Sequence, residues 1–185
     1  AALFSRTVVY FLRPCGVQSL AMAKVCPSVT LECGKVGQKH GTDHALDYLE
    51  ACIHLADHPS LPVAAHDIDL FHTVATVKVP VGVPFGFGDE PGDLRLVSDL
   101  EYLNFRELPA GTVFAEAPAA HAVPLDIRDE RGEDVAGRYF SLEDGLIRTR
   151  LPVMPSMLTS DKTVIRQDCL CYLMERYDAH IPHDG

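Results

Sequence analysis

The pattern of turn residues changes near Pro59, and this change decides what each part of the chain can fold into. From here on, glycine and proline interrupt the chain every few residues, so only short extended pieces fit between the turns. After a longer piece at 67–80, the candidate strands are Leu94–Val97, Thr112–Ala115, Val123–Ile127 and Leu146–Arg150, with turns at 89–92, 109–111, 129–132 and 143–145. Residues 61–185 are therefore predicted to form a mostly-β domain, a small barrel or sandwich, closed by a helix from about Ser160 to Tyr177.

Residues 1–60 follow an α/β pattern instead. Thr7–Leu12 is β-branched and aromatic, Gln18–Val25 can form a short helix, and Ser28–Glu32 is a second candidate strand followed by two glycines. Strand, helix, strand and glycine turn, in this order, predict a βαβ unit with a parallel pair of strands.

The clearest helix pattern runs from about Thr42 to His58. Thr42 or Asp43 can cap its first turn, and Pro59 follows its end. Apolar side chains recur at steps of three and four residues and would form one stripe: Ala45, Leu46, Leu49, Cys52, Ile53 and Ala56.

Two strands are too few for a parallel sheet that helices cover on both faces. The chain begins with Ala1 rather than Met, and we expect the additional strands to come from a segment upstream of it. One side of Thr7–Leu12 or Val29–Leu31 would then be an unpaired edge flanked by apolar side chains. Such an edge pairs readily with another chain, so a homodimer, or self-association through the first forty residues, is expected.

The charge balance argues against two classes of partner. The 185 residues include 16 Lys and Arg against 26 Asp and Glu, a formal net charge of −10. Nucleic acids and anionic membranes both attract basic patches, so neither is expected as a partner. Six cysteines without a CxxC pair or a regular disulfide spacing are interpreted as reduced, mostly buried thiols of a cytoplasmic protein.

Glu32 is the residue that the pattern alone marks as a candidate for catalysis. It ends a predicted apolar strand, and glycines follow it. Ligands of open α/β sheets gather beyond the carboxyl ends of the strands, where a partly desolvated carboxylate can act as a general base on water. The structural alternative is a strand-end carboxylate that loop amides or Lys35 satisfy.

The segment 27–37, Pro-Ser-Val-Thr-Leu-Glu-Cys-Gly-Lys-Val-Gly, resembles the strand that carries the catalytic glutamate in the zinc carboxypeptidase superfamily. The likeness is closest to the succinylglutamate desuccinylase/aspartoacylase family. It continues in order through most of the chain, over His44–Tyr48, Asp67–Pro80, Asn104–Phe114 and Leu151–Met154. The resemblance implies that the chain is the C-terminal part of such a protein: residues 1–60 would end its α/β/α hydrolytic domain, and residues 61–185 would be its β domain.

The resemblance also implies a mechanism and a cofactor. In this family a zinc ion, held by two histidines and a glutamate, polarises an amide carbonyl and acidifies a water molecule. Glu32 would be the catalytic general base and would later protonate the leaving amine. The zinc ligands map upstream of this chain, so none of its residues is assigned as a metal ligand, and the isolated chain is expected to be inactive.

The implied substrate is an acylated amino acid or a small peptide. Met22 stands where aspartoacylases carry an arginine for the substrate carboxylate, and Ser160 stands where they carry a tyrosine near the active site. These departures favour an acylated amine other than N-acetylaspartate or succinylglutamate.

Two alternatives remain open from the sequence. The chain could be a non-catalytic binding or regulatory β module in which Glu32 is vestigial. It could also be a stand-alone metal-binding protein that uses the histidine pairs His40/His44 and His54/His58, each spaced to share one face of a helix.

Overall fold

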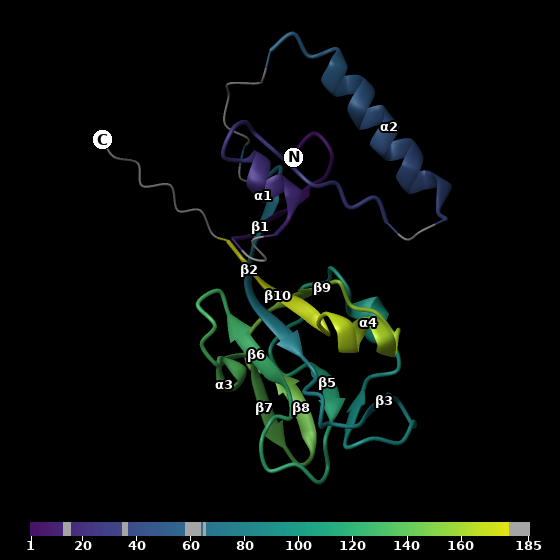
Figure 1. Cartoon of the computed structure of the whole chain (residues 1–185), viewed down its shortest axis with the longest axis vertical. Coiled ribbons are helices and arrows are strands. Elements are labelled where there is room, and N and C mark those ends of the chain that lie inside the picture. Colours follow the sequence, from purple (N-terminus) through teal and green to yellow (C-terminus); the bar gives the residue numbers. More distant parts are fainter. Residues whose placement is uncertain (13–15, 35–36, 58–63, 65, 178–185) are drawn as a thin grey trace, which may run out of the picture. The chain divides into compact units, whose positions relative to one another are not determined.

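The computed structural model describes residues 1–12, 16–34, 37–57, 64 and 66–177 (Figure 1). The fold is mixed α/β and consists mostly of strands, which form two sheets, one of them curled into half a barrel. The chain divides into two compact units, Ala1–Phe71 and His72–Gly185. None of the helices in the described ranges is long and apolar enough to cross a bilayer.

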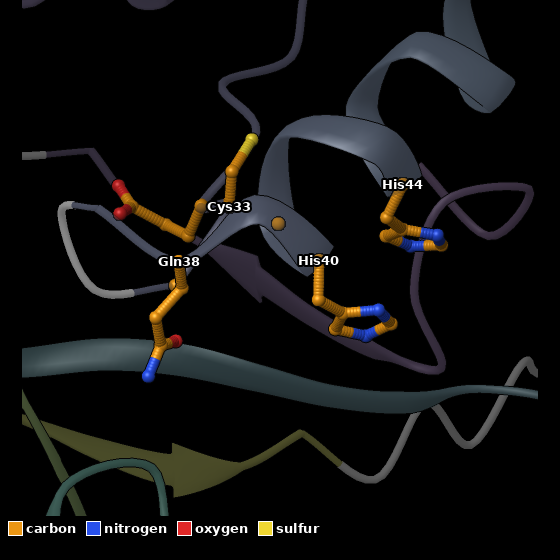
Figure 2. A pocket seen from close by; sticks show the side chains of 7 residues that line it. Cys33, Gln38, His40 and His44 are labelled. Atoms are coloured by element: carbon orange, nitrogen blue, oxygen red, sulfur yellow. The ribbon is translucent and has the colours of Figure 1, made fainter.

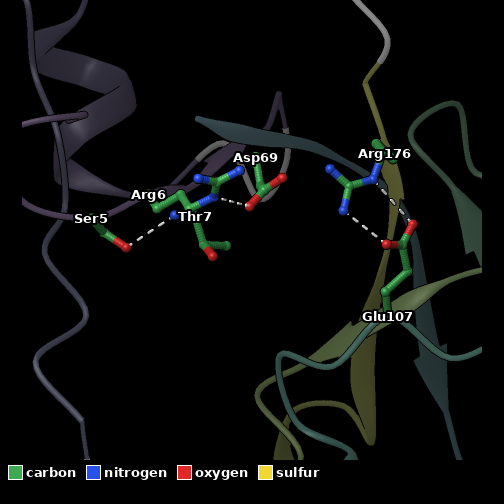
Figure 3. A network of polar contacts seen from close by, with 6 residues as sticks. All are labelled: Ser5, Arg6, Thr7, Asp69, Glu107 and Arg176. Atoms are coloured by element: carbon green, nitrogen blue, oxygen red, sulfur yellow. Dashed lines mark hydrogen bonds and ion pairs between the residues drawn. The ribbon is translucent and has the colours of Figure 1, made fainter. Parts of the chain in front are cut away.

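The first unit contains a short strand and two helices, β1 (Thr7–Tyr10), α1 (Gln18–Met22) and α2 (Lys39–Ile53). β1 pairs with β2 (Asp69–Lys78). The backbone amide of Asp69 donates to the carbonyl of Arg6, and the Arg6 guanidinium lies 2.7 Å from the Asp69 carboxylate (Figure 3). The predicted first strand and both helices are therefore present, and all three are shorter than expected.

The predicted strand Ser28–Glu32 is wrong, and with it the parallel pair. This segment has no regular secondary structure and pairs with no strand of the described chain. β-branched residues favour a strand only where a neighbouring strand completes the hydrogen-bond ladder. β1, the partner that the sequence suggests, pairs with β2 instead.

The apolar stripe of α2 is covered along only one of its two sides. One face is half-buried, and on it Tyr48 meets Phe4 with their ring centroids 5.4 Å apart. The other face is open to solvent, with exposed fractions of 53% for Leu46, 52% for Leu49 and 79% for Ile53. The predicted apolar stripe is therefore present on the helix, but other side chains of the described residues cover only part of it.

The first sheet of the second unit is built around β2. In this sheet β10 (Cys171–Arg176) lies between β2 and β9 (Met154–Ser156). β6 (Asp126–Asp129) pairs antiparallel with residues 75–78 of β2. Alternate side chains of β2 are buried, as at Ala75 and Val77, so the side chains between them lie on the outer face of the sheet.

The second sheet has the order β3-β4-β5-β8-β7. Its strands are β3 (Phe85–Phe87), β4 (Leu94–Leu96), β5 (Val113–Glu116), β8 (Leu146–Thr149) and β7 (Phe140–Glu143). Only β3 and β4 run parallel in this sheet, and its other neighbouring strands are antiparallel. The predicted mostly-β character of this unit is confirmed. Three of the predicted strands coincide with β4, β5 and β8, the longer piece at 67–80 contains β2, and Val123–Ile127 overlaps β6 in part.

Three short helices lie in the connections between the described strands of the second unit. These are η1 (Leu100–Leu103), α3 (Ala136–Tyr139) and α4 (Lys162–Gln167). The core of this unit draws on both sheets, with fully buried side chains at Val77, Leu94, Phe114, Ile127, Ile147 and Leu173. In the first unit, by contrast, Phe71 is the one buried apolar side chain of the described residues, and it is 3% exposed.

The predicted closing helix from Ser160 to Tyr177 is present only in its first part, as α4, and is wrong beyond Gln167. The Asp161 carboxylate accepts hydrogen bonds from the amides of Thr163 and Val164 and caps α4, which ends at Gln167. The chain then enters β10, which Figure 1 shows running alongside β2. Cys171, Leu173 and Met174 are all buried. A short apolar run fits a helix and a strand equally well. Here it forms a strand, because it pairs with β2 on one side and with β9 on the other.

An ion pair near the end of β10 holds that strand to the loop before β5. The Arg176 guanidinium donates to both oxygens of the Glu107 carboxylate, at 3.3 and 2.8 Å (Figure 3). Two parallel contacts of this kind fix orientation better than a single one.

Candidate active site around Glu32

A hollow of about 220 Å³ lies where the segment that carries Glu32 meets the start of α2. Its lining comes from that segment and from the first turns of the helix: Glu32, Cys33, Gly34, Gln38, His40, Gly41 and His44. Figure 2 shows His40 and His44 one turn apart on α2, with Gln38 just before the helix and the Cys33 sulfur directed away from Gln38. The Cys33 thiol donates instead to the carbonyl of Leu31.

Gly41 is what allows the two segments to lie so close together. It is the buried residue of α2, and a Cβ atom added to it would lie 1.6 Å from the carbonyl oxygen of Cys33. No side chain fits in that space. The glycine therefore allows the Glu32 segment to lie directly against the helix.

Glu32 lines the hollow and is exposed. Within the described part of the chain, its carboxylate has no hydrogen bond and no ion pair. The partial desolvation that a strand end would give is not present, because the predicted strand does not form. Lys35, the alternative partner considered from the sequence, lies outside the described residues. Glu32 is thus an accessible carboxylate that could accept a proton from water.

The paired histidines do not form a chelate in this arrangement. The His40 and His44 rings stack with centroids 6.4 Å apart, and His44 Nε2 lies 2.8 Å from the carbonyl oxygen of Phe4. His54 is the C-cap residue of α2, and His58 lies outside the described residues. Among the described side chains, no group of three or more His, Cys, Asp or Glu could hold a metal ion. The residues that the structure describes therefore do not fit zinc.

The two positions that depart from the family pattern have ordinary structural surroundings. Met22 ends α1 and is 44% exposed. The backbone amide and the hydroxyl of Ser160 both donate to Glu101 Oε1, at 3.0 and 2.6 Å.

Five of the six cysteines are described, and all five are free thiols. Cys169 and Cys171 are buried as predicted, Cys33 and Cys52 are half-buried, and Cys26 is exposed. Burial raises the pKa of Cys169 to about 11, and it also raises the pKa of Cys171. Neither thiol is activated for nucleophilic chemistry, which requires the thiolate.

A second hollow, of about 320 Å³, lies in the second unit, and no motif in the sequence predicts it. Its polar lining comes from four elements of that unit and the turns beside them: His72 in β2, residues 129–131 at the end of β6, Arg138 and Tyr139 in α3, and Glu175 in β10. The alternation of β2 places His72 on the outer face. No local pattern brings Glu130 or Glu175 to it.

Comparisons with protein-family models, with curated proteins and with solved structures return no match for this chain.

Proposed function

We propose that this chain is the C-terminal part of a zinc-dependent hydrolase of the succinylglutamate desuccinylase/aspartoacylase family, with the zinc-carboxypeptidase-like fold. The reaction is hydrolysis of an amide bond in an acylated amino acid or a small peptide. Support comes from the ordered series of segments that resemble the family, from residue 27 to residue 154. The observation that carries the proposal is Glu32, a carboxylate that lines a hollow and is unpaired within the described chain.

The role of Glu32 is proton transfer. Its carboxylate accepts a proton from the attacking water and returns it to the leaving amine, as a general base and then a general acid. Gly41 allows the Glu32 segment to lie against α2, and this contact places the carboxylate beside the helix although the segment is not a strand. The zinc ligands belong to a segment upstream of this chain, and the parent protein includes both parts.

The test is Glu32→Gln in the zinc-loaded parent protein. Glutamine keeps the shape of the side chain but accepts no proton at neutral pH. We expect amide hydrolysis to fall about a hundred- to ten-thousand-fold, with unchanged zinc content and circular dichroism. Glu50→Gln is the matched control, because Glu50 is an exposed glutamate of α2 outside the hollow. If the Glu32→Gln protein released amine from acylated amino acids at a near-normal rate, the proposal would be contradicted.

A non-catalytic binding module is the second candidate, and the hollow of the second unit favours it. That hollow is lined entirely by residues of His72–Gly185 and does not involve Glu32. Two results together would favour this candidate: the unmodified protein hydrolyses no amide at a measurable rate, and the Glu32→Gln variant still binds its ligand.

A further inference from the structure

The second hollow is lined by charged side chains of both signs and by apolar ones. Val74 and Val135 supply apolar lining, while Glu130 and Glu175 supply carboxylates and Arg131 a guanidinium. Its volume of about 320 Å³ lies at the lower end of the range for small-molecule sites.

Each of the two carboxylates is held through one oxygen only. Glu130 Oε1 lies 3.1 Å from His72 Nε2. Glu175 Oε1 accepts hydrogen bonds from both Arg138 and Tyr139, each at 2.7 Å. Oε2 of both glutamates has no partner among the described residues. Both side chains are therefore fixed in place and retain an oxygen that can accept a hydrogen bond from a cationic ligand.

The hydrogen bond from Tyr139 to Glu175 is kept at neutral pH. Tyr139 is 1% exposed, and burial raises the pKa of its hydroxyl well above the ordinary range. The hydroxyl keeps its proton and donates it to Glu175, so Glu175 is positioned before any ligand arrives.

Arg131 provides the opposite charge. Its backbone amide is bound to the Asp129 carboxylate within the turn after β6. Its guanidinium has no partner among the described residues. A guanidinium of this kind can bind a carboxylate through two parallel hydrogen bonds.

We propose that this hollow binds a free α-amino acid with an apolar side chain. The ammonium group donates to Glu130 and Glu175, the carboxylate accepts from Arg131, and the side chain lies on Val74 and Val135. The site lies within the second unit and does not depend on amide hydrolysis or on Glu32.

The test is calorimetric titration of the full chain with L-alanine, L-valine and L-leucine at millimolar concentrations. We expect saturable binding of at least one of them. N-acetyl-L-leucine lacks the ammonium group and L-leucinamide lacks the carboxylate, so each should bind at least about tenfold more weakly than L-leucine. Absence of saturable binding for all three amino acids would overturn the proposal, as would equal binding of the two blocked analogues.

Two variants test the named residues separately. Glu175→Gln still accepts from Arg138 and Tyr139 but loses its charge, and Arg131→Gln alters an exposed turn. Each should weaken amino acid binding about tenfold or more. The matched controls are Glu133→Gln and Arg128→Gln, two exposed residues nearby that do not line the hollow. If circular dichroism shows that Glu175→Gln does not fold, the test rests on Arg131→Gln. Unchanged affinity for the amino acid in a folded Arg131→Gln variant would contradict the proposal.

Discussion

Gly41 is the residue on which the hollow around Glu32 depends. The carbonyl of Cys33 occupies the space that any side chain at position 41 would need. In an open helix, alanine would be preferred over glycine by about 1 kcal/mol. Here the backbone contact outweighs that preference, because a Cβ atom at 1.6 Å forces the Glu32 segment or the helix to move.

Gly41→Ala should therefore loosen the contact between the Glu32 segment and α2. We expect a loss of about 1–3 kcal/mol, typical of overpacking, in the local stability that protects the α2 amides from hydrogen exchange. Gly137→Ala, in α3, is the control, because a Cβ atom there meets nothing within 4 Å. Unchanged exchange in Gly41→Ala would mean that the two segments do not lie in contact in solution.

The buried thiols and phenols of the second unit predict a loss of stability at high pH. Burial raises the pKa of Cys169 from 9.0 to about 11 and the pKa of Tyr172 from 10.0 to about 12. Folding thus favours the protonated forms. Their contribution is complete below the ordinary pKa values and is lost as the pH rises through the raised ones.

We therefore expect the urea midpoint of unfolding to fall between about pH 9 and pH 11, the interval that the Cys169 shift spans. Cys169→Ala should make this fall shallower. A midpoint that stays constant over this interval in the unmodified chain would show that the buried thiol does not control alkaline stability.

At the scale of elements, the sequence predicts best where the turn chemistry is local. Asp144 and Gly145 join β7 to β8 with φ angles of 52° and 76°, the two positive values that a type I′ hairpin requires. The turn at 143–145 and the strand after it follow from those residues. The prediction fails at Ser28–Glu32 and at β10, where pairing with a strand distant in sequence decides between helix, strand and loop.

The two hollows depend mostly on contacts between segments that are distant in sequence, so the sequence predicts them only in part. Glu32 stands out because it precedes glycines in a short apolar segment, although that segment is not a strand. The contact between Gly41 and Cys33 has no local signature. The hollow that brings together His72, Glu130 and Glu175 depends on the order of strands in the sheet, which the sequence does not specify.

Because β10 is a buried strand, replacing its central leucine by alanine should lower the free energy of unfolding more than the same replacement at an exposed position. Leu173 is fully buried at the centre of β10, whereas Val164, in α4, is 45% exposed. Leu173→Ala should destabilise the chain by about 2–5 kcal/mol, the range for removing a buried leucine side chain. Val164→Ala should cost far less. Equal effects in urea unfolding would contradict the burial pattern of β10.

At the scale of the whole molecule, the two units differ in how much apolar surface they bury. Nearly all the buried apolar side chains of the described residues belong to the second unit, whereas Leu46, Leu49 and Ile53 of α2 are exposed together. An apolar helix face of this kind favours contact with further protein surface.

The isolated chain should therefore associate with itself in a concentration-dependent way, as measured by light scattering. The double variant Leu46→Gln/Ile53→Gln should reduce this association. Val81→Gln should not reduce it, because Val81, although 92% exposed, is not part of this helix face. A clean monomer whose Thr7–Leu12 amides are strongly protected from hydrogen exchange would show that the first unit needs no partner.

The central proposal is that Glu32 is the catalytic carboxylate of a zinc hydrolase whose zinc ligands lie outside this chain. The most direct measurement is the zinc content of the purified 185-residue chain after dialysis. We predict little or no bound zinc, since no set of three ligands exists among the described residues. Stoichiometric zinc that resists dialysis and is lost when His40 and His44 are changed to alanine would contradict the account.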